Sequence, residues 1–148
     1  MDSIKFSEII DNYDLKYCTP EINADEVEIS TREVNRPALQ LAGFFEHFDK
    51  ERVQVIGNVE CAFLDNMERK NRKWVYDKLM SSGIPCLIIC RGVDPDKDML
   101  EAAVKYGVPV ATTDTATSPF DAELSRWLHV QLAPAVLIYV VMFIVQGP

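Results

Sequence analysis

From residue 53 onward, short apolar runs alternate with longer amphipathic segments. The runs VQVI, PCLIIC and VPVAT occupy residues 53–56, 85–90 and 108–112. Between them, apolar residues recur at helical spacing, and these segments end at Gly83 and Gly107. Continuous apolar runs are typical of strands that are covered on both faces. The alternation therefore predicts an α/β fold in which helices pack on a mostly parallel sheet through right-handed crossovers.

The remaining elements follow from the same signals. Phe6, Ile9 and Ile10 predict a short amphipathic first helix, and LKYC and VEIS predict two short strands. Pro37 favours the start of another helix. The expected N-cap and start residues of the later helices are Asn58, Asp94 with Pro95 in the first helical position, and Ser118 with Pro119.

The charge and the cysteines limit the function classes. The 23 acidic residues outnumber the 15 basic ones, for a net charge of −8, and such a chain repels polyphosphate, so we do not expect nucleic acid as a partner. The four cysteines lack CxxC spacing and make no zinc set with the two histidines, so we expect free thiols and no metal. The first residues carry no signal-peptide pattern, and together with reduced thiols this favours the cytoplasm.

The C-terminal segment has an unusual composition. Residues 135–145 are apolar throughout, rich in β-branched residues, and no Asp, Glu, Lys or Arg follows Arg126. A membrane-spanning helix needs about 20 apolar residues, so we expect a buried strand and no membrane association. The predicted organisation is an α/β domain over residues 1–134 followed by an apolar strand within 135–148. Exposed apolar strands pair with other chains, so self-association is expected.

Polar residues follow the predicted strands. In open parallel sheets, ligands bind beyond the carboxyl ends of the strands, and helix N-termini favour anions there. The candidate ligand- or partner-binding residues are Asn35, Arg36, Asn58, Arg91, Gly92, Thr113 and Ser118. The same residue types also cap helices, so plain capping remains an alternative. Arg36 either pairs with a neighbouring carboxylate and locks its turn, or reaches a ligand or partner.

The motifs of phosphoryl and acyl transfer are missing from the sequence. It contains no GxxxxGK[ST] loop and no nucleophile elbow, and Ser118 has no histidine near it. We therefore assign no catalytic residue and expect no activity from this chain alone.

The order of several segments resembles one bacterial family. NRPALQLAGFFEHFDKERVQVIGNVE, then IPCLIICRG, EAAVKYGVPV and LHVQLAP closely resemble the N-terminal domain of HPr kinase/phosphorylase over nearly the whole chain. The resemblance implies a cytoplasmic, hexameric parent enzyme of carbon catabolite repression that phosphorylates and dephosphorylates a serine of the phosphocarrier HPr. It places the catalysis, with ATP and Mg²⁺, in a C-terminal P-loop domain. It also implies an α/β fold similar to the N-terminal domains of Mur ligases.

The C-terminal segment departs from that family. The family's His-Gly pair falls on Tyr139-Val140, and the aspartate of the same strand falls on Ile144. The segment is therefore either the start of a P-loop domain or its remnant in a stand-alone relative. Two functions remain open: a regulatory or assembly domain of an HPr kinase/phosphorylase-like protein, or a sensor that binds a nucleotide or phosphorylated metabolite without catalysis. Neither hypothesis requires a cofactor in this chain.

Overall fold

The computed structural model describes residues 2–134 and residue 144. The strand expected over residues 136–145 therefore lies outside the described residues, apart from Ile144. Within residues 2–134, none of the helices combines the length and the apolar character that a bilayer crossing demands.

A five-stranded sheet forms the centre of the molecule. Its order is β2-β7-β6-β5-β4, with β2 at Lys16–Tyr17, β4 at Val34–Asn35, β5 at Val53–Ile56, β6 at Leu87–Ile89 and β7 at Val110–Thr112. The four strands β4 to β7 run parallel, and β2 pairs with β7 antiparallel. This confirms the predicted α/β class with a mostly parallel sheet. A separate two-stranded sheet joins β1 (Ile4–Lys5) to β3 (Glu28–Ile29) in antiparallel pairing.

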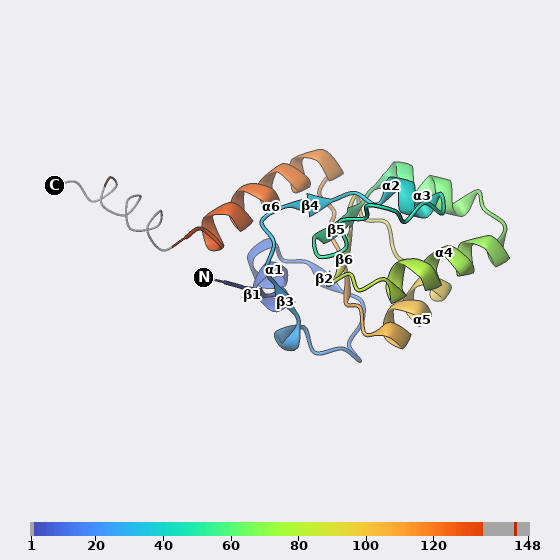
Figure 1. The fold of residues 1–148 in the computed structure, drawn as a ribbon, viewed down its shortest axis with the longest axis horizontal. Helices are drawn as coiled ribbons and strands as arrows, with labels where there is room; N and C mark the ends of the chain where they lie inside the picture. Colours follow the sequence, from blue (N-terminus) through green and yellow to red (C-terminus); the bar gives the residue numbers. More distant parts are fainter. Residues whose placement is uncertain (1, 135–143, 145–148) are drawn as a thin grey trace.

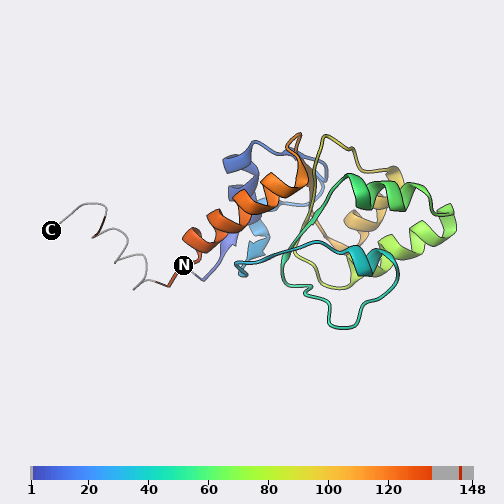
Figure 2. The ribbon, with the colours of Figure 1, turned by 90° about the horizontal axis from the view of Figure 1, so that it is seen from above.

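The helices divide between the two faces of the sheet (Figure 1, Figure 2). The helices are α1 (Phe6–Tyr13), α2 (Ala38–Leu41), α3 (Asn58–Asp65), α4 (Arg69–Ser81), α5 (Lys97–Tyr106) and α6 (Thr117–Gln131), with a 3-10 turn at Ala24–Glu26. Strands β4 to β7 follow one another in a single direction. Right-handed crossovers therefore place α2 to α5 on one face, and α1 and α6 cover the other.

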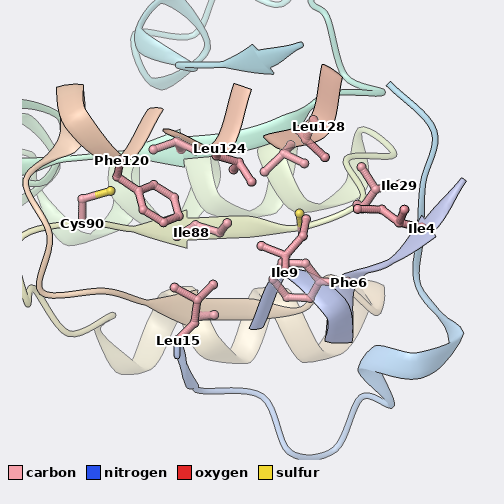
Figure 3. Packing of buried hydrophobic residues seen from close by; sticks show 14 of the residues in the cluster. Ile4, Phe6, Ile9, Leu15, Ile29, Ile88, Cys90, Phe120, Leu124 and Leu128 are labelled. Carbon is pink, nitrogen blue, oxygen red and sulfur yellow. The ribbon is translucent and has the colours of Figure 1, made fainter. Parts of the chain in front are cut away.

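The parallel strands β5, β6 and β7 each contribute to two cores. In β6 and its flanks, Cys86, Ile88 and Cys90 are buried on the side of α1 and α6, whereas Leu87 and Ile89 are buried on the side of α4 and α5. Figure 3 shows side chains of α1 and α6 gathered around Ile88. This burial on both faces explains why the strand sequences are continuously apolar.

Two predicted helix caps are corrected by the structure. The cap of α5 is Asp96, whose Oδ1 accepts the Met99 N–H at 2.8 Å, and not Asp94. The Tyr76 hydroxyl donates to Asp96 Oδ2 at 2.6 Å and so holds the Asp96 side chain in place. Because Asp96 is the cap, Pro95 precedes the helix. The cap of α3 is Gly57, and Asn58 is the first helical residue. Gly107 ends α5 in the left-handed conformation as predicted, with φ of 72°.

Candidate functional site

The carboxyl ends of the four parallel strands meet at one edge of the sheet. There, β4 leads into Arg36, β5 into Gly57, β6 into Cys90 and Arg91, and β7 into Thr113. The Cys90 N–H donates to the Ile56 carbonyl at 2.9 Å. The structure thus brings the loops that carry the predicted site residues to a common edge.

Arg36 forms an ion pair with Glu60 on α3. Its Nε donates to Glu60 Oε1 at 2.9 Å, and its Nη2 contacts the same oxygen. The Glu60 side chain is only 6% exposed, and its Oε2 accepts the Gly57 N–H at 3.2 Å. Of the two interpretations of Arg36, the structure shows the pairing with a carboxylate. The pair connects the end of β4 to the start of α3.

Asn35 is also engaged within the protein. Its Nδ2 donates to Gln54 Oε1 at 2.7 Å, and buried Gln54 donates from Nε2 to the carbonyls of Asp49 and Arg52 at 3.1 and 2.9 Å. A buried amide needs such partners, because an unsatisfied polar group is costly. Asn35 therefore stabilises the loop that precedes β5.

Gly57 and Thr117 approach each other closely. A Cβ built on Gly57 would lie 2.0 Å from Thr117 Oγ1 and 2.9 Å from Thr117 Cβ. Thr117 is buried as the first residue of α6. Only glycine permits this contact, which brings the start of α3 against the start of α6.

Arg91 and Gly92 both adopt left-handed conformations, with φ of 63° and 66°. Their N–H groups donate to the carbonyls of Thr115 and Thr113, each at 2.9 Å. Thr113 in turn donates its N–H to Ile89 at 2.9 Å and accepts the Thr115 N–H at Oγ1. These two loops therefore hold each other through their backbones. The Arg91 side chain is exposed.

Asn58 and Ser118 lie at the starts of α3 and α6, and both are exposed. The cap of α6 is Ala116, which has no side chain to accept a hydrogen bond. Ser118 therefore lies within the first turn of α6 and does not cap it. The seven predicted residues form two groups along this edge. Asn35, Arg36 and Asn58 belong to the end of β4 and the start of α3, and Arg91, Gly92, Thr113 and Ser118 belong to the β6 and β7 loops and the start of α6. The Gly57–Thr117 contact joins the two groups.

Sequence reasoning missed Glu60 and Thr117. Glu60 is three residues after the cap of α3, the position from which a carboxylate reaches back to the cap N–H, and this spacing was the available signal. Nothing in the sequence indicates the partner of Thr117, because Gly57 lies 60 residues away along the chain and the contact depends on the tertiary fold.

An acidic cavity lies beside the loop that follows β6. It has a volume of about 70 Å³, and its lining includes the carboxylates of Asp65, Asp94 and Asp96. Burial of the Tyr76 side chain, and next the hydrogen bond of its hydroxyl to Asp96, raise the pKa of Tyr76. This hollow is too small for a nucleotide, and its charge opposes a phosphate. Among the described residues, no group of three histidine, cysteine or carboxylate side chains is arranged to hold a metal ion.

All four cysteines are free thiols, as predicted. Burial raises the pKa of Cys61 and that of Cys90, each to about 11, and raises the pKa of Cys86 further. Thiols with pKa values this high are overwhelmingly protonated at neutral pH and are poor nucleophiles.

Comparisons with known proteins show which family shares these features. The family described as HPr Serine kinase N terminus matches residues 4–128. The HPr kinase/phosphorylase of Lachnoclostridium phytofermentans is 44% identical over 147 residues, which cover 99% of this chain and 48% of that protein. That of Caldicellulosiruptor bescii is 42% identical over 120 residues, covering 80% of this chain and 39% of the relative. The chain thus spans about half the length or less of these curated relatives.

A solved structure shares the fold. The CBS and DRTGG domains of the regulatory region of Clostridium perfringens pyrophosphatase superpose with a TM-score of 0.54 at 19% identity, covering 82% of this chain and 45% of that one. At this identity the likeness concerns the fold alone. By the family match and the identity to its relatives, the chain belongs to the HPr serine kinase N-terminal domain family.

Proposed function

We propose that this chain is a non-catalytic regulatory and assembly domain of an HPr kinase/phosphorylase-like protein. In this proposal the parent enzyme phosphorylates and dephosphorylates a serine of HPr, and HPr is a partner of the parent protein. The observation that carries the proposal is the family match over residues 4–128, together with 44% identity over nearly the whole chain.

The polar edge of the sheet supports a structural role. Glu60, Asn35 and the Arg91-Gly92 backbone make their hydrogen bonds with other protein groups. Phosphoryl transfer depends on positioned phosphate and Mg²⁺ ligands, and the sequence contains no P-loop. ATP and Mg²⁺ therefore belong, in this proposal, to a different part of the parent protein.

A chimeric enzyme tests the proposal. This chain replaces the matching half of the L. phytofermentans enzyme, and transfer of labelled γ-phosphate to HPr serine is measured. We expect no transfer by the isolated chain above a heat-killed control. We expect the chimera to match the natural enzyme in assembly state and regulated activity, and we expect the catalytic half alone to differ from it in both. Transfer by the isolated chain, or a chimera that behaves like the catalytic half alone, contradicts the proposal.

A second candidate function is a small-ligand sensor, and the conformation of Arg91 favours it. A non-glycine residue in the left-handed region carries a conformational cost, and such residues concentrate at functional sites. Here the strained residue presents an exposed guanidinium at the edge of the sheet where ligands bind in open α/β folds. The pyrophosphatase regulatory region that shares the fold was solved in complex with its activator, diadenosine tetraphosphate.

Thermal-shift measurements with nucleotides and sugar phosphates test the sensor function. A ligand at 100 times its Kd stabilises its protein by about 2.7 kcal/mol. We expect Arg91→Ala to remove such a shift while leaving the unliganded melting temperature nearly unchanged. Arg126→Ala, which removes another exposed arginine, is the matched control and keeps the shift. Absence of a shift with every compound contradicts the sensor function and leaves the assembly role in place.

A further inference from the structure

Large apolar side chains are exposed on α2, α3, α4 and the segment after α2. Leu39, Phe44, Val59, Phe63 and Trp74 have exposed fractions of 62%, 47%, 77%, 46% and 51%. We call these five residues the α2–α4 apolar surface. Monomeric domains rarely leave a contiguous apolar patch uncovered, and such patches mark interaction sites.

Two hollows indent this surface on either side of Phe63. The first, of about 190 Å³, lies between α2 and α3, and its lining includes Leu41, Val59 and Phe63. The second, of about 340 Å³, lies between α2 and α4, and its lining includes Leu41, Phe63 and Trp74. The Trp74 ring packs beside Gly43. The shared lining residues make the two hollows one continuous apolar groove.

The one charged side chain among the lining residues of the groove, that of Glu60, already has partners. Glu60, which lines the first hollow, is bound by Arg36 and by the Gly57 N–H. An occupant of this groove therefore needs no charged group to satisfy the rim. Its interior selects for apolar side chains.

The chain itself contains a segment of that chemistry. Residues 135–145 are eleven consecutive apolar residues without a charge. Ile144, the described residue within this segment, is 71% exposed. An apolar groove and an uncharged apolar segment are both stabilised when each covers the other.

The position of the segment makes a contact within one chain unfavourable. Helix α6 ends on the opposite side of the molecule from α2, α3 and α4 in both views (Figure 1, Figure 2). A domain of this size is at least roughly 36 Å across, from its expected radius of gyration. Eleven fully extended residues reach about 36–40 Å, so crossing the molecule uses the whole segment and leaves none of it to fill the groove.

We propose that residues 135–145 of one copy dock in the groove of the α2–α4 apolar surface of a second copy, and that the second copy returns the same contact. Two identical contacts related by a two-fold axis close the assembly at a dimer. The inference rests on the assembly role proposed above and gives that role a partner, a second copy of this chain, and a surface.

Two variants of the 148-residue chain test the groove and the apolar segment one at a time. The groove variant carries Val59→Glu and Phe63→Glu, two residues that line the groove, and the segment variant carries Ile138→Asp and Val141→Asp. Val130→Glu is the matched control, because Val130 is an exposed apolar residue of α6, 61% exposed, outside the groove. Circular dichroism confirms that each variant is folded, and Val59→Glu alone serves as a second groove variant because its side chain is mostly exposed.

Sedimentation velocity gives the result. We expect the intact chain and Val130→Glu to be dimers, and each double variant to be a monomer by itself. An equal mixture of the groove and segment variants regains a weaker dimer, because one intact segment still meets one intact groove. This recovery is the signature of an exchanged contact.

Every other pattern overturns the inference. A monomeric intact chain means that the surface and the segment do not join two copies. Loss of the dimer in the segment variant alone indicates pairing of two segments, and loss in the groove variant alone indicates pairing of two apolar surfaces. Two monomeric variants whose mixture stays monomeric also contradict reciprocal docking. In all four cases the chimeric enzyme still tests the assembly role independently.

Discussion

At the scale of single residues, the pairing of Arg36 with Glu60 is expected to stabilise the fold. Arg36 neutralises Glu60, whose side chain is 6% exposed while that of Arg36 is 37% exposed. Arg36→Ala leaves a buried carboxylate with only the Gly57 N–H. We expect the free energy of unfolding to fall by about 1–3 kcal/mol, the cost of a buried charged group that loses its partner. Urea denaturation measures this loss.

Two variants control for this effect. Glu60→Gln in the Arg36→Ala background removes the uncompensated charge but keeps an acceptor for the Gly57 N–H, so it recovers part of the lost stability. Arg126→Ala removes an arginine from an exposed pair with Glu123, and such pairs contribute about 0–1 kcal/mol. Equal losses for Arg36→Ala and Arg126→Ala contradict a structural role for the buried pair.

The thiols give a second prediction at this scale, a loss of stability in alkali. The pKa of Cys61 and that of Cys90 are about 11 in the folded chain, whereas a free thiol has a pKa of about 8.5. Between these values the unfolded chain releases its thiol protons and the folded chain keeps them, so unfolding becomes more favourable as pH rises. The stabilisation is complete below the unfolded pKa and is lost as pH rises towards 11.

Urea midpoints at pH 8 and pH 10 measure this dependence. We expect the free energy of unfolding to decrease more between pH 8 and pH 10 in the intact chain than in the double variant Cys61→Ala/Cys90→Ala. The comparison concerns this decrease and not the stability of each protein at pH 8. Equal losses in the two proteins show that these thiols do not contribute to the alkaline destabilisation.

At the scale of elements, the contact between the starts of α3 and α6 depends on Gly57. Its backbone conformation, φ −131° and ψ −159°, is accessible to any residue, so the requirement for glycine is steric. Gly57→Ala forces a methyl group against Thr117, and we expect a loss of about 1–3 kcal/mol, typical of overpacking. Thr117→Gly in the same chain removes the clashing atoms and reduces the loss.

Asn58→Ala is the matched control for the same helix start. Asn58 is exposed and follows the cap, so its replacement leaves the urea midpoint nearly unchanged. If Asn58→Ala costs about 1 kcal/mol, the value expected for a lost cap, then Asn58 and not Gly57 organises the start of α3.

The elements also show where prediction from sequence succeeds. The strand predicted at residues 53–56 is β5, because a fully buried strand leaves a continuous apolar run. The cap of α5 was predicted two residues early, since Asp94 and Asp96 are equally suitable by residue type. In the structure Asp96 accepts the Met99 N–H and also binds the hydroxyl of Tyr76, which is 20 residues away and not predictable from the local sequence.

The candidate site was predicted less completely than the fold. The turn residues after the predicted strands gave seven candidate residues, and the structure places the loops that carry them at one edge of the sheet. Their partners were not predictable, because Arg36 and Glu60 are 24 residues apart and nothing in the local pattern joins them. Whether these residues bind a ligand stays a prediction.

At the scale of the whole molecule, the sheet couples its two cores. Leu87 and Ile88 are adjacent in β6 but face opposite sides, the first towards α4 and α5 and the second towards α1 and α6. If the helices on one face separate, the sheet loses its cover on that face and exposes a row of large apolar side chains. We therefore expect both cores to unfold in a single cooperative transition, as small domains usually do.

The two tryptophans make this expectation measurable, since one lies on each side of the sheet. Trp74 is on α4, beside the hollow between α2 and α4. Trp127 is on α6 and packs edge to face on Tyr13, with the two ring centroids 5.9 Å apart. Trp127→Phe leaves a fluorescence signal from the α4 side, and Trp74→Phe leaves one from the α6 side. In each variant we expect the urea midpoint from fluorescence to equal the midpoint from far-ultraviolet circular dichroism, which reports all helices. A fluorescence transition that precedes the circular dichroism transition in one variant and not in the other means that the two faces unfold separately. In that case the sheet does not couple the cores.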